Sequence, residues 1–376
     1  MTQTPLPPLE RIPPQIAAVD DYEGFAKPRM TPAAFAYVSG GAADELTLRE
    51  NVEAFRRLKL RTRVLRDVDG GDTRLELLGH ELPYPILLAP VALQKLAHPD
   101  GELATVLAAA AMRAPMIVSA QASVSLEDIA ARAERQAVLW MQLYLHGDRG
   151  FLRELVARAE AAGYRALVVT VDAPVSGVRN REQRAEFALP PGIEAVNLRG
   201  MRATMGSVAR AGESPVFGSG VLAGAPTWKD IEWLRSVTTL PVLVKGIMSP
   251  DDAATAVSAG VAGIVVSNHG GRTLDTQPAT IDVLESIAHA VDGRLPLLLD
   301  GGIRRGTDIL KALALGARAV LVGRPYVYAL AAAGASGVAH VLHILRTELE
   351  MAMVMTGCQR LADVGPELVL RSRGWS

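Results

Sequence analysis

Short apolar runs recur along the chain and are separated by longer stretches with helical patterning. The runs are apolar almost throughout instead of alternating with polar residues, which is typical of strands buried on both faces in a parallel sheet. Eight runs are present: Pro85–Ala92, Pro115–Gln121, Val138–Leu145, Ala166–Ala173, Pro241–Ile247, Gly263–Gly270, Pro296–Ile303 and Ala319–Tyr326.

Alanine-rich segments between these runs predict helices, among them 102–112, 151–163 and 306–317. Eight repeats of strand and helix predict an α/β protein built as one (β/α)8 barrel. A doubly wound open sheet is the alternative, but the glycine-rich GxGxxG turn expected after its first strand is missing.

Three segments lie outside the repeat. Residues 1–30 predict a proline-rich, extended arm, and 31–376 a single barrel domain. Before the first strand we expect two short helices, the first starting at Pro32 after Thr31 and the second with a capping box formed by Thr47 and Glu50. The long connection at about 190–226, after the fourth strand, predicts a lid loop, and a membrane contact there is left open.

Composition narrows the function classes. The 376 residues are 49% hydrophobic and carry a formal net charge of -1, which allows a large core and gives no electrostatic reason to bind nucleic acid. The only cysteine, Cys358, cannot form an internal disulfide, and the first residues lack the pattern of a secretory signal, so we expect a cytoplasmic protein. The apolar window Tyr326–Leu345 is interrupted by glycine and histidine, so we interpret it as a packed helix, with no membrane partner.

Polar residues close nearly every predicted strand. Active sites of such barrels are formed by the carboxyl ends of the strands, so these side chains are expected to meet at one mouth. They are Ser119, Gln121, Gln142, Tyr144, Thr170, Asp172, Lys245, Ser267, His269, Asp300 and Arg324.

The last two strands are followed by DGGIRRG and GRP, in which glycine stands beside arginine. Glycine permits close backbone approach and arginine offers a bidentate fork for an anion. Loops after strands seven and eight hold phosphate in many such barrels. A phosphorylated ligand bound by Arg304 and Arg324 is therefore predicted.

His269 and Asp172 are candidates for a general base and the carboxylate that orients it. Arg179 and Arg272 offer two forks for a substrate carboxylate. Lys245 is a candidate Schiff-base amine or a fixed positive charge. We expect no metal site, because His340 and His343 share a helix face without an evident third ligand.

The motifs APVALQKLAHPDGE, VVTVDAPVSGVRNR, VLVKGI, SNHGGRTLD, LLLDGGIRRGTDILKALALGA and VGRP, in this order, resemble the FMN-dependent α-hydroxy-acid oxidase and dehydrogenase family. The resemblance extends from about Tyr37 to Gly357. It implies FMN as cofactor, oxidation of an (S)-2-hydroxy acid of the lactate, glycolate or mandelate class to the 2-oxo acid, and a homotetramer. The electron acceptor is oxygen, giving hydrogen peroxide, or a quinone or another acceptor.

The resemblance also assigns roles. His269 removes a proton with Asp172 as its partner; Tyr37, Arg179 and Arg272 bind the substrate carboxylate; and Tyr144 bonds the hydroxyl. The residues implied to bind FMN are Pro90, Val91, Ala92, Ser119, Gln142, Thr170, Lys245, Ser267, Asp300, Gly301, Gly302, Arg304, Gly323 and Arg324.

Two rival functions remain at this point. One is a barrel aldolase that uses Lys245 as a Schiff-base amine. The other is an FMN-binding protein without catalytic activity. Gln121 stands where several relatives place an aromatic ring, which predicts a more polar or differently shaped substrate pocket. Ala92 is more similar to the residue of the oxidases than to the glycine of lactate monooxygenase, which suggests that product leaves before oxygen reacts further.

Overall fold

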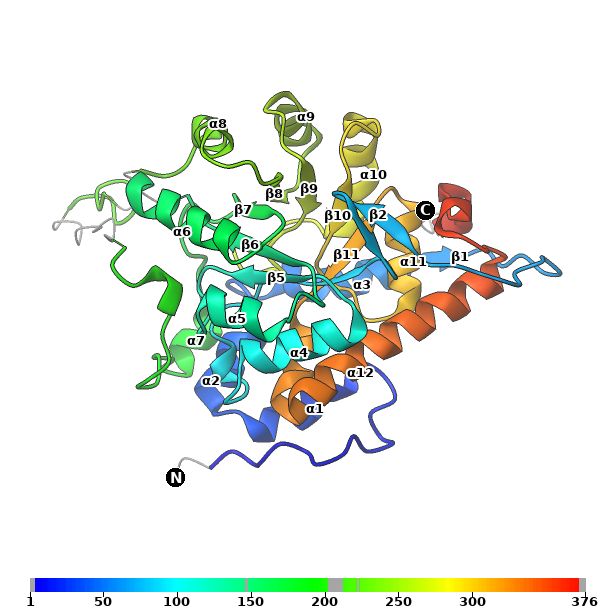
Figure 1. The fold of residues 1–376 in the computed structure, drawn as a ribbon, viewed down its shortest axis with the longest axis horizontal. Helices are drawn as coiled ribbons and strands as arrows, with labels where there is room; N and C mark the ends of the chain where they lie inside the picture. Colours follow the sequence, from blue (N-terminus) through cyan, green and yellow to red (C-terminus); the bar gives the residue numbers. More distant parts are fainter. Residues whose placement is uncertain (1–3, 146–147, 202–211, 221, 223, 372–376) are drawn as a thin grey trace.

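The structure is a computed structural model that describes residues 4–145, 148–201, 212–220, 222 and 224–371. Eight parallel strands form a closed barrel in the order β10-β11-β4-β5-β6-β7-β8-β9 (Figure 1). Each strand lies inside one of the predicted runs, so the (β/α)8 barrel is confirmed and the open sheet was the wrong alternative. The strands are β4 (Ile86–Leu88), β5 (Met116–Ser119), β6 (Leu139–Leu143), β7 (Leu167–Thr170), β8 (Val242–Ile247), β9 (Gly263–Val266), β10 (Leu297–Leu299) and β11 (Ala319–Val322).

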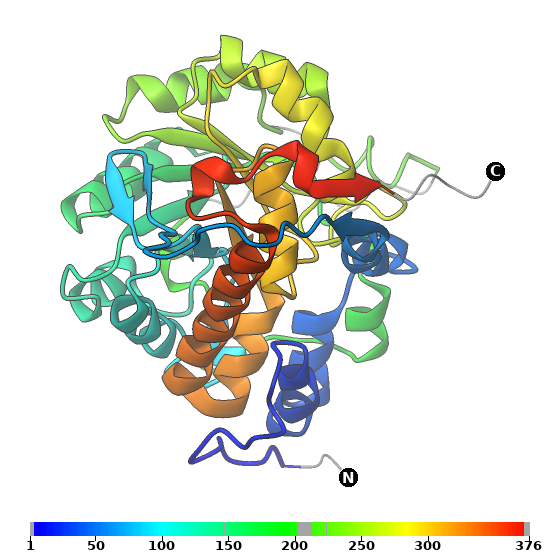
Figure 2. The ribbon, with the colours of Figure 1, turned by 90° about the vertical axis from the view of Figure 1, so that its right-hand side faces the viewer.

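Helices follow the strands and surround the barrel (Figures 1 and 2). The three helices predicted from sequence correspond to α4, α6 and α11. The surrounding helices are α4 (Glu102–Met112), α5 (Leu126–Arg132), α6 (Arg149–Ala161), α8 (Trp228–Ser236), α9 (Pro250–Ser258), α10 (Thr280–Val291), α11 (Gly306–Ala314) and α12 (Arg324–Thr356).

The strands divide the apolar residues into two clusters because successive side chains of a strand point to opposite faces. One cluster joins strand residues such as Leu88 and Val118 to the helices, and therefore lies outside the strands. The other contains alternate strand residues such as Leu87 and Trp140 but none from the helices, and fills the barrel interior. Leu75 of the hairpin β2 (Leu75–Leu77) and β3 (His80–Leu82) joins the inner cluster.

The N-terminal segment is attached to the barrel. Its helices are α1 (Asp21–Ala26), η1 (Lys27–Arg29), α2 (Pro32–Ser39) and α3 (Leu46–Arg57). The described backbone before α1 forms bends and turns but no helix or strand, the amide of Leu9 donates to Ala332 O (2.8 Å), and Ile16 and Val19 are buried. A domain boundary at residue 30 stays a prediction.

The predicted start of α2 is confirmed, since Thr31 accepts a hydrogen bond from the amide of Ala34 (3.2 Å) ahead of Pro32. The capping box of Thr47 and Glu50 was wrong. Helix α3 already begins at Leu46, and the Thr47 hydroxyl instead donates to Gln277 O (3.2 Å) and accepts from its amide (2.9 Å).

Helix α12 is long and apolar enough to cross a membrane, but 72% of its most apolar window is buried inside the protein, as expected of a packed helix. It is interrupted at Ala333 and Gly334, which have non-helical backbone angles. At its far end, β1 (Leu58–Leu60) pairs antiparallel with β12 (Val369–Arg371). Other short elements are η2 (Gln94–Leu96), η4 (Leu361–Asp363) and η5 (Pro366–Leu368).

The connection between β7 and β8 contains α7 (Asn180–Arg184) and η3 (Val196–Leu198). The lid predicted at 190–226 includes 202–211, 221 and 223, which lie outside the described residues, so its function as a lid stays a prediction.

Candidate active site at the mouth of the barrel

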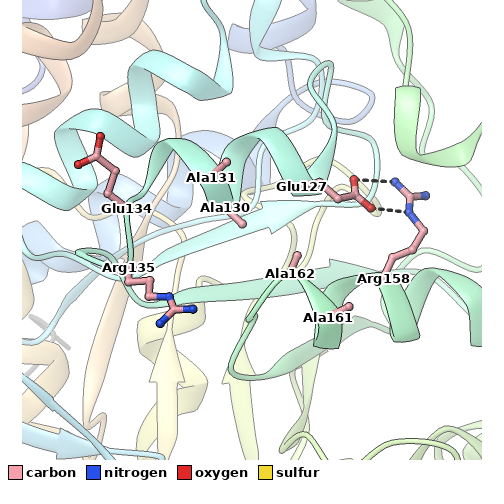
Figure 3. Close-up of a pocket in the computed structure, with 8 residues that line it drawn as sticks. All are labelled: Glu127, Ala130, Ala131, Glu134, Arg135, Arg158, Ala161 and Ala162. Atoms are coloured by element: carbon pink, nitrogen blue, oxygen red, sulfur yellow. Dashed lines mark hydrogen bonds and ion pairs between the residues drawn. The ribbon is translucent and has the colours of Figure 1, made fainter.

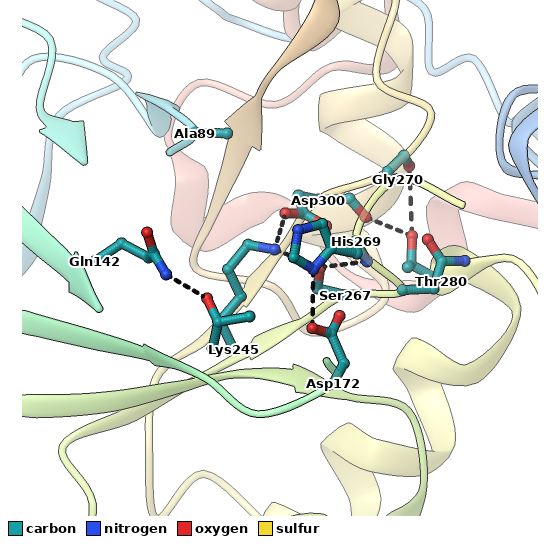
Figure 4. A network of polar contacts seen from close by, with 12 residues as sticks. Ala89, Gln142, Asp172, Lys245, Ser267, His269, Gly270, Thr280 and Asp300 are labelled. Carbon is teal, nitrogen blue, oxygen red and sulfur yellow. Dashed lines mark hydrogen bonds and ion pairs between the residues drawn. The ribbon is translucent and has the colours of Figure 1, made fainter. Parts of the chain in front are cut away.

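Polar side chains at the ends of neighbouring strands form a continuous hydrogen-bonded row. Ser119 Oγ donates to Gln142 Oε1 (3.1 Å), and Gln142 Nε2 donates to Thr170 Oγ1 (3.0 Å). All three side chains are buried, so their polar atoms are paired with one another and shielded from bulk water. The predicted convergence of these strand ends is therefore confirmed (Figure 4).

Lys245, at the end of β8, is a buried cation with two partners. Its Nζ lies 2.8 Å from Ser267 Oγ and 3.0 Å from Asp300 Oδ2. Burial disfavours the charged amine, but the negative charges of Asp300 and Asp172 outweigh it and hold the pKa of Lys245 above its ordinary value. A Schiff-base lysine must lose its proton, so this environment favours a fixed positive charge over the aldolase alternative.

His269 follows β9 in a turn with left-handed backbone angles at three successive residues (φ 57°, 63° and 73°). Such angles favour glycine at Gly270 and Gly271, and a Cβ on Gly271 would lie 2.6 Å from the amide nitrogen of Leu48. The turn is fixed by a hydrogen bond from the His269 amide to Ser267 Oγ (3.1 Å). The glycines of SNHGGRTLD therefore position the imidazole.

Asp172, two residues after the end of β7, lies beside His269. Its Oδ1 is 2.9 Å from His269 Nδ1 (Figure 4). Burial would raise the pKa of Asp172, but its hydrogen bond with His269 and the nearby positive charges hold it below the ordinary value. Burial lowers the pKa of His269 despite the opposing effect of Asp172. The pair is thus an ionised carboxylate beside a neutral imidazole whose Nε2 can accept a proton.

A reciprocal amide pair, which the sequence gave no means to predict, holds the histidine turn. Asn51 Nδ2 donates to Asn268 Oδ1 and Asn268 Nδ2 donates to Asn51 Oδ1, both at 2.9 Å. Asn268 Oδ1 also accepts from the amide of Gly271 (3.2 Å). Both asparagines are fully buried, so α3 fixes the residue next to His269.

Arg179 is a cation with unused hydrogen-bonding capacity. Its Nη1 is buried and has no hydrogen-bond partner. Burial, aided by the neighbouring charge of Arg272, lowers the pKa of Arg179 to about 10. Tyr37 and Tyr144 lie close enough to interact with its charge, and burial raises the pKa of both phenols. An anion bound here would compensate the charge of Arg179.

The guanidinium of Arg272 already has hydrogen-bond and ion-pair partners within the protein. Its Nη1 donates to Tyr37 O (2.8 Å) and Gly40 O (2.7 Å), and its Nη2 pairs with Glu182 Oε1 (3.0 Å). Its guanidinium also lies over the Tyr37 ring, 5.3 Å from the centroid, and that ring stacks on Phe187. Sequence reasoning missed Glu182, because nothing in its surroundings marks it as a partner of a residue 90 positions away.

The row of polar strand ends supplies donors and acceptors of the kind that a flavin ring and its ribityl chain need, and its contacts with FMN stay predictions. Asp300 Oδ1 is buried and has no hydrogen-bond partner in the protein, so it is available to accept a hydrogen bond from a ribityl hydroxyl. A Cβ on Gly323 would meet nothing nearer than 3.8 Å, so the backbone there is open to a ligand. Pro90, Val91 and Ala92, directly after β4, are only partly buried. Their predicted contacts with FMN, like those of Gly301, stay predictions.

The predicted phosphate arginines have protein partners. Arg324 donates to Val38 O, Gly40 O and Gly270 O, and Arg304 pairs with Asp20 at 2.8 Å. Arg324 thus links α2 to the histidine turn, and phosphate binding by either arginine stays a prediction.

The structure gives another reason for one glycine of DGGIRRG. A Cβ on Gly302 would lie 2.0 Å from Asn51 O, so packing against α3 requires glycine at this position. The sequence-based explanation, close approach of a ligand, is not needed here.

Two hollows on the outside of the barrel carry no comparable chemistry. One, of about 630 Å³, lies between α5 and α6, where alanines and the Arg158–Glu127 ion pair (2.7 Å) line it (Figure 3). The other, of about 690 Å³, is lined by residues such as Arg113 and Arg346. Within the described part of the chain, no group of three or more His, Cys, Asp or Glu could hold a metal ion.

The histidine–aspartate pair, the buried lysine charge and the unpartnered Arg179 Nη1 at the barrel mouth are compatible with a flavin-dependent oxidoreductase. Residues 26–371 match the model of the FMN-dependent dehydrogenase family. The chain belongs to this family and is an FMN-dependent enzyme that oxidises (S)-2-hydroxy acids.

Several relatives are similar over nearly their whole length. An L-lactate oxidase of Nostoc sp. is 49% identical over 92% of this chain and 95% of the relative. A peroxisomal (S)-2-hydroxyacid oxidase of Arabidopsis thaliana is 47% identical over 93% and 95%. A crystal structure of mandelate oxidase with (S)-2-phenylpropionate superposes with a TM-score of 0.84 at 40% identity, covering 94% of this chain and 98% of that one.

Proposed function

We propose that this enzyme oxidises a small (S)-2-hydroxy acid of the L-lactate or glycolate class and that oxygen then accepts the electrons, giving hydrogen peroxide. The observation that carries the proposal is the 2.9 Å contact of His269 Nδ1 with Asp172 Oδ1 in the same mouth as Arg179, whose Nη1 lacks a partner. The names of the relatives, lactate oxidase and (S)-2-hydroxyacid oxidase, support the substrate class and oxygen as acceptor.

Different side chains bind the substrate and accept its proton. Arg179 binds the substrate carboxylate, helped by Arg272 and Tyr37. Because His269 Nδ1 is bonded to Asp172, its Nε2 accepts the proton of the substrate. Asp172 stabilises the imidazolium that forms. Proton uptake by His269 is required whether the α-hydrogen leaves as a hydride or the substrate passes through a carbanion.

Lys245 and Tyr144 supply a positive charge and a hydrogen-bond donor to the reaction. When bound, FMN supplies the two-electron acceptor. Lys245, buried and positively charged, would stabilise negative charge on the reduced cofactor. The Tyr144 phenol keeps its proton, since burial raises its pKa, and donates to the substrate oxygen.

An anaerobic titration of the purified yellow protein tests the proposal. Glycolate, L-lactate and (S)-mandelate are added in turn, and we expect L-lactate or glycolate to bleach the visible flavin absorbance. Admission of oxygen should restore the colour and release one peroxide per substrate. Failure of all three acids to bleach would show a catalytically silent FMN protein. Bleaching without peroxide would favour a quinone or another acceptor.

We also propose a cytoplasmic homotetramer. A single buried cysteine, Cys358, is compatible with a reducing compartment. Fluorescence microscopy of the tagged protein and light scattering after size-exclusion chromatography test the two parts separately.

A further inference from the structure

Glu182 lies in the candidate active site but has no part in the proton transfer described above. Its Oε1 lies 3.0 Å from Nη2 of Arg272, and the two side chains retain 16% and 17% of their exposure. The negative charge of Glu182 also acts to raise the pKa of Tyr37 and of Arg179. It is therefore a largely desolvated carboxylate among the groups that bind the substrate carboxylate.

Arg179, Arg272 and Glu182 together form a unit that we call the carboxylate clamp. Arg179 is the N-cap residue of α7 and Glu182 lies within this short helix, so the same segment supplies one cation and one anion. Glu182 neutralises Arg272, while Arg179 keeps an unpartnered Nη1. The clamp thus has one uncompensated positive charge, which is the charge that a single carboxylate balances.

We infer that Glu182 is a specificity-determining residue: its carboxylate limits the clamp to one substrate carboxylate and disfavours 2-hydroxy acids that carry a second one. This inference rests on the proposed function. The physical reason is repulsion between like charges, which is strong in a site from which water is largely excluded. A substrate with one carboxylate leaves the clamp neutral, whereas a second carboxylate would add a negative charge to a clamp that already contains Glu182.

Contacts that do not involve the substrate hold α7 in place. Arg181 donates to Ser39 Oγ (3.2 Å) and pairs with Glu45. The amide of Ala43 donates to Val178 O (2.9 Å) just before the helix. Replacement of Glu182 therefore changes the charge of the clamp while these attachments to the α2–α3 connection remain.

The test compares L-lactate with (S)-malate, a 2-hydroxy acid with a second carboxylate, on the FMN-loaded full-length enzyme. Glu182→Gln keeps an acceptor for Arg272 but removes the charge. We expect KM for L-lactate to fall, and the ratio of kcat/KM for malate to that for lactate to rise about tenfold. Glu182→Asp keeps the charge and should keep the wild-type ratio. If Glu182→Gln does not fold, Glu182→Ala supplies the neutral variant.

Glu45→Gln is the matched control, because it removes the same charge from a side chain that contacts α7 through Arg181. The glutamine can still accept from the amide of Gly41, as Glu45 does at 2.9 Å. This control should leave the malate-to-lactate ratio unchanged. An unchanged ratio in the neutral variants at position 182 overturns the inference. If wild-type enzyme oxidises none of the hydroxy acids, the proposed function itself is wrong.

Discussion

Replacement of Asp172 by asparagine measures how much the histidine–aspartate pair contributes to the reaction. Asparagine has the same shape but no charge, so the effect isolates the ionic part of the 2.9 Å contact with His269. The Asp172 side chain is only 6% exposed, so solvent screens the contact little. A buried charge-assisted hydrogen bond of this kind stabilises the imidazolium by about 3 kcal/mol, which corresponds to about two decades in the rate constant.

The assay is the anaerobic reduction of bound FMN by substrate in a stopped-flow instrument across a range of pH. His269 acts as a base only when it is neutral, and burial keeps its pKa below the ordinary 6.5, so the rate should fall only in acid. Because Asp172 raises the pKa of His269, Asp172→Asn should lower the plateau and move the acid limb to lower pH.

The control is Asp275→Asn, which alters a carboxylate that accepts from the amides of Asp44 and Thr47 rather than from His269. This variant should lose stability but keep the wild-type reduction rate. A reduction rate in Asp172→Asn equal to that of the wild type would refute the assigned partnership with His269.

Three further variants test separate parts of the site. His269→Gln should retain FMN and lose about three decades of turnover, about 4 kcal/mol of barrier; near-normal turnover would remove His269 from its role. Arg179→Met should raise KM for L-lactate about a hundredfold, because the substrate carboxylate loses a buried cation, and an unchanged KM in steady-state kinetics would assign carboxylate binding to other residues. Asn51→Ala should lower the free energy of unfolding by about 2 kcal/mol in a denaturant titration, because it breaks the amide pair with Asn268; no loss of stability would contradict the anchoring role.

The sequence was sufficient for the barrel, because a strand buried on both faces is apolar throughout and its partners need not be known. The strand-end residues followed from the same pattern: Gln142, Thr170 and Lys245 interrupt apolar runs at positions where the fold brings all carboxyl ends together. The strands and their polar end residues could thus be predicted from the sequence, because both depend only on the burial of neighbouring residues.

Features that depend on two distant segments could not be predicted. Thr47 has the spacing of a capping box, but a loop 230 residues away offers its hydroxyl a better-placed partner. Asn51 and Asn268 are 217 residues apart, and neither neighbourhood indicates the other. The glycine beside Arg324 suggested a phosphate site. The guanidinium of Arg324 instead donates hydrogen bonds to carbonyl oxygens of α2 and of the histidine turn. The roles of these side chains depend on hydrogen-bond partners that are far away in the sequence.

The interruption of α12 gives the segment around Leu9 a structural role. At Ala333 and Gly334 the helix ladder breaks, and the carbonyl of the buried Ala332 accepts the amide of Leu9 instead. Removing the chain through Leu9 would leave that carbonyl unpaired in an apolar layer, at a cost of about 1–3 kcal/mol. A protein shortened to the matched residues 26–371 would lack this hydrogen bond, so its longest helix would be less stable at the interruption.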